Sequence, residues 1–161
     1  MKLAACITIC LLGFLGINIE DVRRQFEEAK NSRETTETLY TSLQGYTKND
    51  PVLLAYKGAS LILRARLLPK QEDKRKAVVE GVALLDGAVR SAPKEVEIRL
   101  IRLAIQENAP KVIRYKKNMG EDKQMILSNF AAQPTAVKNL VRRYAQQSTL
   151  FTAEEQGKLG R

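Results

Sequence analysis

The chain has 161 residues, of which 27 are Lys or Arg and 18 are Asp or Glu, so its formal net charge is +9. It contains no histidine, and its two cysteines, Cys6 and Cys10, both lie near the N-terminus. Reactions that depend on imidazole, and metal sites built on it, are therefore excluded. The length fits one domain with its own hydrophobic core, and the positive charge favours anionic partners.

The first sixteen residues have the pattern of a secretory signal peptide. Met1 and Lys2 give a short basic start, and residues 3–16 form an apolar run that ends before Glu20. A membrane-spanning helix needs about 20 apolar residues, so we predict cleavage between residues 16 and 20. Cleavage removes both cysteines. We expect an exported protein of the bacterial periplasm or envelope; the alternative is a membrane anchor formed by an uncleaved N-terminal segment.

Residues 17–161 are predicted to form a single all-α domain, because apolar residues recur at helical spacing and no segment alternates like a half-buried strand. We expect six to seven helices, arranged as stacked antiparallel hairpins. Their predicted ranges are about 19–30, 31–46, 51–68, 72–91, 94–107, 121–132 and 134–147. Residues 111–117 are ambiguous and fit a short helix, and residues 148–161 are expected to be a frayed tail.

The segment from residue 51 to residue 68 is the most apolar part of the domain. Asp50 can accept hydrogen bonds from the free amides of the first turn, and Pro51 suits the first helical position. A helix that is apolar nearly all round is normally a central core helix. Its small residues Ala55, Gly58 and Ala59 are expected to let a neighbouring helix approach closely.

Two stretches have the residue spacing that closes a helical hairpin at a proline. They are Gly81, Leu85, Ala88 and Pro93, and, less regularly, Leu39, Leu43, Tyr46 and Pro51. Together they resemble degenerate tetratricopeptide (TPR) repeats over residues 30–107, although the two prolines lie farther apart than the repeat length of about 34 residues. The resemblance implies a right-handed stack of hairpins that binds protein. The alternative is an ordinary irregular helical bundle.

Basic residues gather in the second half of the domain, with tyrosines among them. If the segments that carry them pack side by side, they form one positive face that can grip phosphate or carboxylate groups. The members of this predicted anionic-partner patch are Arg99, Arg102, Lys111, Arg114, Tyr115, Lys116, Lys117, Lys138, Arg142 and Arg143. The alternative is a solvated surface with ion pairs at helical spacing, such as Glu95 with Arg99.

Paired carboxylates are the remaining candidates for chemistry. The pairs are Glu34 with Glu37, Glu95 with Glu97, and Glu154 with Glu155. Two carboxylates can share acid–base work on a glycan, but each of these pairs lies in an early helical turn, where the helix dipole favours negative charge. We therefore assign no catalytic, cofactor-binding or metal-binding residue and expect no cofactor.

These patterns favour a non-enzymatic interaction module that docks a peptide or protein partner in a groove between helical hairpins, with a bias toward acidic partners. The alternative is a binder of anionic lipid or polysaccharide through the basic C-terminal face. A third hypothesis is a glycan-cleaving enzyme that acts through carboxylates. Nucleic acid is not an expected partner, because no recognised nucleic-acid motif is present. The sequence leaves the oligomeric state open.

Overall fold

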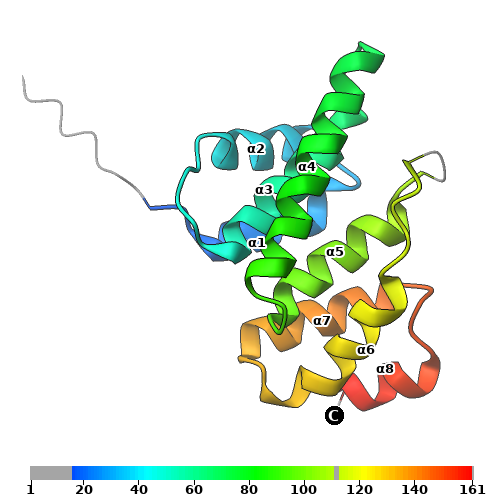
Figure 1. Cartoon of the computed structure of the whole chain (residues 1–161). Coiled ribbons are helices and arrows are strands. Elements are labelled where there is room, and N and C mark those ends of the chain that lie inside the picture. The colour runs from blue at the N-terminus through cyan, green and yellow to red at the C-terminus, as the bar shows by residue number, and fades with distance from the viewer. Residues whose placement is uncertain (1–15, 111–112, 161) are drawn as a thin grey trace, which may run out of the picture.

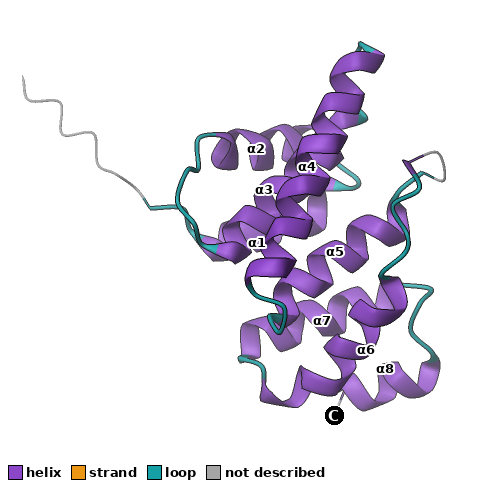
Figure 2. Cartoon of the chain, viewed as in Figure 1, coloured by secondary structure: helices purple, strands orange, loops and turns teal. Residues whose placement is uncertain are grey.

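The computed structural model describes residues 16–110 and 113–160, and over these ranges it contains helices and no strands (Figure 1, Figure 2). The all-α prediction is confirmed, with eight α-helices in the described part of the chain where the sequence predicts six to seven. They are α1 Ile19–Ala29, α2 Arg33–Gln44, α3 Pro51–Ala65, α4 Gln71–Ser91, α5 Val96–Asn108, α6 Met119–Asn129, α7 Thr135–Gln147 and α8 Ala153–Gly160; a 3-10 turn, η2, spans Phe130–Ala132. The predicted signal peptide, except for Gly16, lies outside the described residues, and so does Lys111.

The helices begin where local capping chemistry satisfies the free amides of the first turn. At α3, Oδ1 of Asp50 accepts hydrogen bonds from two backbone N–H groups at 2.8 and 3.0 Å, as the sequence predicts. At α2 the capping residue is Ser32. The hydroxyl of Ser32 accepts a bond from the backbone N–H of Thr35 at 3.1 Å, which fixes the start of α2 at the next residue.

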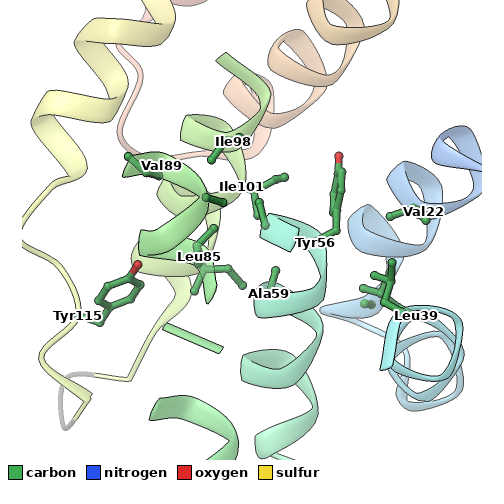
Figure 3. Packing of buried hydrophobic residues seen from close by; sticks show 14 residues of the cluster. Val22, Leu39, Tyr56, Ala59, Leu85, Val89, Ile98, Ile101 and Tyr115 are labelled. Carbon is green, nitrogen blue, oxygen red and sulfur yellow. The ribbon is translucent and has the colours of Figure 1, made fainter. Parts of the chain in front are cut away.

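The predicted close approach of a neighbouring helix occurs between α3 and α4, at two facing glycines. A Cβ atom on Gly58 would lie 2.6 Å from the carbonyl oxygen of Gly81, and one on Gly81 would lie 2.5 Å from that of Gly58. The two backbones therefore touch, which glycine alone permits. Tyr56 and Ala59 are buried beside this crossing (Figure 3), so α3 is a central core helix. Among the described helices, none is long and apolar enough to cross a bilayer.

Two hydrophobic cores meet at α5. The first core joins α1 through α5 and includes Tyr56, Leu85 and Ile101 (Figure 3). The second core joins α5 to α6, α7 and α8 and includes Leu103 and Ile126. α5 is buried on nearly every side as a result, and its charged residues Glu97, Arg99 and Arg102 are buried as well. α5 thus holds the two halves of the domain together.

Residues 148–160 pack against the domain instead of forming the frayed tail that is predicted for 148–161. Phe151 and Leu159 are 5% and 3% exposed and belong to the second core. The N–H of Thr152 donates to the carboxylate of Glu155 at 2.8 Å, and the N–H of Glu155 donates to the hydroxyl of Thr152 at 3.2 Å. This reciprocal capping starts α8 and brings Leu159 onto the core.

From residue 113 onward, the chain between α5 and α6 is not the short helix that the sequence allows over residues 111–117. Ile113 has 3-10 geometry and is followed by irregular backbone. Arg114 has a left-handed φ of 52°. Tyr115 then turns inward and joins the first core (Figure 3), so one aromatic side chain anchors the segment.

Candidate functional site

A groove of about 850 Å³ opens between the N-terminal half of α4 and the C-terminal half of α5. α3 contributes to its floor, and parts of α1 and α7 close one side. Figure 1 shows the N-terminal part of α4 projecting away from the rest of the domain, while α4 and α5 are joined at their other ends by a short turn. The groove therefore lies in the angle between two diverging helices.

Each long wall of the groove is one face of a helix. The wall residues are Gln71, Lys74, Arg75, Val78 and Val79 on α4, and Ile101, Ala104, Ile105 and Asn108 on α5. Both sets follow the i, i+3, i+4, i+7 spacing that places side chains on a single helical face. In a closed helical bundle two such faces would pack together or on a third helix. Here they border an open space.

The exposure of Val79 indicates that no described part of the chain covers this space. Its side chain is 64% exposed, and no other large apolar side chain within the described ranges is classed as exposed. Ile62, Leu63 and Val78 line the same hollow and are only partly buried. Single exposed apolar residues are normal, but a cluster of apolar side chains in one hollow is typical of an interaction site.

The aromatic side chains of the groove present rings and keep their hydroxyls engaged elsewhere. Phe26 meets Tyr56 edge to face, with ring centroids 5.4 Å apart. The hydroxyl of Tyr56 donates to Glu97 at 2.7 Å, and that of Tyr144 donates to Glu107 at 2.5 Å. Burial raises the pKa of both phenols, and these carboxylates raise it further. The rings are left to make apolar contacts.

A buried carboxylate fixes three of the helices that line the groove. Glu97 of α5 accepts hydrogen bonds from Nε and Nη2 of Arg23 at 2.8 and 2.6 Å, in addition to the bond from Tyr56. The hydrogen bond to Glu97 holds the pKa of the Arg23 guanidinium above its ordinary value. Because Arg23 belongs to α1 and Tyr56 to α3, this two-pronged contact sets the position of α5 against both helices.

Positive charge dominates the rim of the groove. Lys30, Arg66, Lys74 and Arg75 line it, against a single carboxylate, Glu27. That carboxylate is already held by Nε and Nη2 of Arg143, at 2.8 and 2.9 Å. The bond to Glu27 raises the pKa of Arg143. We call the four lining cations Lys30, Arg66, Lys74 and Arg75 the basic rim.

Two arginines of the predicted anionic-partner patch lie inside the protein. Arg99 and Arg102 are 8% and 6% exposed, and both bind Asp122, which is fully buried. Asp122 is 2.8 Å from Nη1 of Arg99, and Arg102 grips it through Nε and Nη2, each at 2.7 Å. Burial alone lowers the pKa of Arg102, but its bonds to Asp122 outweigh that and raise it. These two arginines cannot contribute to an exposed patch, which corrects the prediction.

Tyr115 also does not belong to the exposed patch that the sequence predicts. It is buried, and its hydroxyl donates to Asp86 at 2.7 Å. Asp86 is also 3.4 Å from Nη1 of Arg102. Burial, helped by the hydrogen bond to Asp86, raises the pKa of the Tyr115 phenol. Instead of stacking on a ligand, Tyr115 joins the chain after α5 to α4.

The other described members of the predicted patch point in different directions. Arg142 donates to the backbone oxygen of Leu159 in α8, whereas Arg143 binds α1 through Glu27. Arg114, Lys116 and Lys117 are exposed in the segment before α6, and Lys138 is partly buried on α7. Lys111 falls outside the described residues. The structure therefore divides the nine described members among the interior, two helix contacts, one exposed segment and a partly buried position on α7.

The basic rim was not predicted, because its members come from three separate places in the sequence: the C-cap of α1, the C-cap of α3 and the first turns of α4. A signal was present on α4, where Lys74, Arg75, Val78 and Val79 follow helical spacing. This spacing is equally typical of a helix face that packs in the core. It could not show that α5 diverges from α4 and leaves this part of the face uncovered.

Nothing else in the described ranges suggests a metal centre: no group of three or more His, Cys, Asp or Glu side chains there could hold an ion. Comparisons of the chain with family models, with curated proteins and with solved structures found no match. The groove and its basic rim are accordingly the basis on which function is argued.

Proposed function

We propose that the protein is a non-enzymatic interaction module that docks a segment of a partner protein in the groove between α4 and α5. The observation that carries the proposal is the apolar hollow of about 850 Å³, with Val79 64% exposed at its wall. Covering such a surface removes apolar area from water, which stabilises a complex by roughly 25 cal/mol per Å². The bonds around Glu97 support a groove that exists before the partner arrives.

The size of the groove favours a chain segment over a folded domain. Hollows of about 300–1,000 Å³ have the size of small-molecule sites, so this groove can enclose a few side chains but not a folded domain. The α4 wall runs from Gln71 to Val79. At a rise of 1.5 Å per residue this wall is about 12 Å long, or roughly two helical turns. The proposed occupant is therefore a few side chains of a peptide, held at its apolar face.

Export to a bacterial envelope is the second part of the proposal, and it rests on the sequence of residues 1–16 alone. The earlier alternative, an anionic lipid or polysaccharide bound by a basic C-terminal face, has less support. That face would need Arg99, Arg102 and Tyr115, which are buried and bonded internally.

Site-specific photocrosslinking tests the docking proposal. A photoreactive amino acid replaces Val79 on the groove wall or, as a matched control, the neighbouring exposed Glu80, which does not line the groove. We expect crosslinks to a partner from position 79, few from position 80, and loss of the former in Ala104→Arg, which fills the groove. Ala83→Arg, on an exposed part of α4, should leave them intact.

The same comparison contains the result that would overturn the proposal. Equal crosslinking from positions 79 and 80, or crosslinks from position 79 that persist in Ala104→Arg, would mean that contact does not occur in the groove. Circular dichroism of each variant separates this outcome from loss of the fold.

A further inference from the structure

The residues that line the groove indicate the chemistry of its occupant as well as where the occupant binds. We infer, resting on the proposed function, that the docked segment is an amphipathic α-helix with acidic residues along one flank of its apolar stripe. Three observations support this inference: the polarity of the walls, the hydrogen-bonding state of each rim cation, and the wall on which the unpaired cations lie.

The walls favour a helical occupant over an extended one. Both walls present side chains of complete helices, whose backbone groups are bonded within the helix, and the side chains of the hollow are mostly apolar. An extended peptide buried there would leave its own N–H and C=O groups without partners, which is costly. A helix satisfies those groups internally and presents apolar side chains at i, i+3, i+4 and i+7, the spacing of the walls.

The four cations of the basic rim differ in how far they are already satisfied. Arg66 donates to the backbone oxygens of Lys30 and Ala29 at the C-terminal end of α1, where the helix dipole favours a cation. Lys30 donates to the side chain of Gln147 at 3.0 Å. Lys74 and Arg75, by contrast, have neither a hydrogen bond nor an ion pair with a side chain of the described residues.

The acidic residues near Lys74 and Arg75 do not neutralise the charge of these two side chains. Glu72 and Asp73 are exposed in the first turn of α4 but do not line the groove, and Glu27 is bound by Arg143. Lys74 and Arg75 therefore face the hollow with unmatched charge. A partner that brings carboxylates to this rim gains attraction, and a basic partner meets repulsion.

The unpaired charge is confined to one wall of the groove. Lys74 and Arg75 both belong to α4, whereas the residues of α5 that line the groove are uncharged, with Asn108 the polar one among them. A helix lying in the groove would meet cations along one flank and neutral groups along the other. The acidic residues of the occupant are therefore expected on one flank only, which also fixes how it rotates in the groove.

Designed helical peptides test this inference on the full-length chain. They share one stripe of leucines at i, i+3, i+4 and i+7 and carry Glu, Gln or Lys on one flank; a fourth peptide has the Glu flank and a central proline. Fluorescence anisotropy should show the Glu peptide binding about tenfold more tightly than the Lys peptide at low salt, because several exposed ion pairs together reach that factor. The difference should shrink at about 1 M salt, where charges are screened within roughly 3 Å.

Charge reversal supplies the matched variants. Lys74→Glu with Arg75→Glu should invert the preference, so that the Lys peptide binds more tightly. Lys70→Glu with Lys76→Glu makes the same change in net charge at exposed positions of the same hairpin that do not line the groove, and should preserve the preference for Glu. Inversion by both pairs would mean that net charge, not the rim, selects the peptide, and would overturn the inference.

Other outcomes separate this inference from the proposed function. If the Glu, Gln and Lys peptides bind equally and Ala104→Arg blocks them all, docking in the groove stands and the acidic flank is wrong. If the proline peptide binds as well as its parent, the helical occupant is wrong. If the peptides bind but Ala104→Arg has no effect, the groove is not the site, and the proposed function fails with the inference. Binding of palmitate in the groove without any binding of the peptides would also overturn both.

Discussion

The arginines on α5 and the cations on α4 are the same kinds of residue in opposite environments. Arg99 and Arg102 are buried against Asp122 and hold α5 to α6. Lys74 and Arg75 lie on a groove wall with no carboxylate partner among the described side chains. The guanidinium groups of Arg99 and Arg102 bind acceptors inside the protein, whereas the charged groups of Lys74 and Arg75 have no such acceptor among the described side chains. Neighbouring acids and burial, rather than the local density of charge, decide which cations are available to a partner.

The variant with the largest expected effect is Asp122→Ala, which removes the carboxylate that Arg99 and Arg102 share. It leaves two buried guanidinium groups without their main counter-charge, so the free energy of unfolding should fall by about 3–5 kcal/mol. Urea unfolding followed by circular dichroism measures it. Asp122→Asn should lose most of the same amount, because it keeps the shape and removes the charge.

Glu121 provides the control for that variant. Its carboxylate also binds Arg99, at 2.5 Å, but its side chain is 58% exposed. The bond to Arg99 lowers the pKa of Glu121, yet solvent screens the pair, so Glu121→Ala should cost less than about 1 kcal/mol. Equal losses in the Glu121 and Asp122 variants would break the distinction between buried and exposed charge.

The crossing of α3 and α4 sets the angle at which α4 carries its free cations. Gly81→Ala should destabilise the protein by about 1–3 kcal/mol, because the added methyl meets the backbone oxygen of Gly58 and the side chain of Ile62. It should also weaken peptide binding by moving the α4 wall. Gly87→Ala is the matched control on the same helix: its methyl would meet nothing closer than 3.7 Å, so this change should be neutral or stabilising. A neutral Gly81→Ala would contradict the backbone contact.

The stability of the protein at alkaline pH tests whether the Tyr115 phenol is buried and hydrogen-bonded. Burial and Asp86 raise the pKa of this phenol in the folded state, whereas in the unfolded chain it ionises near pH 10. Its contribution to stability is therefore complete below about pH 10 and is lost as the pH rises above that value. Unfolding free energies at several alkaline pH values should fall more steeply for the natural chain than for Tyr115→Phe, by up to about 1.4 kcal/mol per pH unit. Equal slopes would contradict a buried, bonded phenol.

Much of the helical framework was predictable because it depends on local chemistry. Asp50 caps α3, and the apolar stretch of α3 forms core, both from short-range patterns. The close approach at Gly58 was predicted as well, although its partner, Gly81, was not. The resemblance of residues 30–107 to tetratricopeptide repeats stays a prediction.

The candidate site was much less predictable, because it depends on contacts between distant segments. Arg99 and Asp122 are far apart along the chain, and no local pattern shows that they meet in the interior. Tyr115 follows a left-handed Arg114, so its inward turn belongs to a loop without periodicity. The groove is set by the divergence of α4 from α5, which the buried faces of both helices together determine.

The smallest expected effect on stability comes from removing Lys74 and Arg75, the unpaired cations of the groove wall. Lys74→Ala with Arg75→Ala should change the free energy of unfolding by no more than about 0.5 kcal/mol, because neither side chain has a charged partner in the described structure to lose. Urea unfolding on the same scale as Asp122→Ala measures it, and the Glu-flanked peptide should bind more weakly to this variant. A loss above about 1 kcal/mol would mean that these cations already support the fold. The rim would then resemble the arginines of α5, and its free charge could not be assigned to a partner.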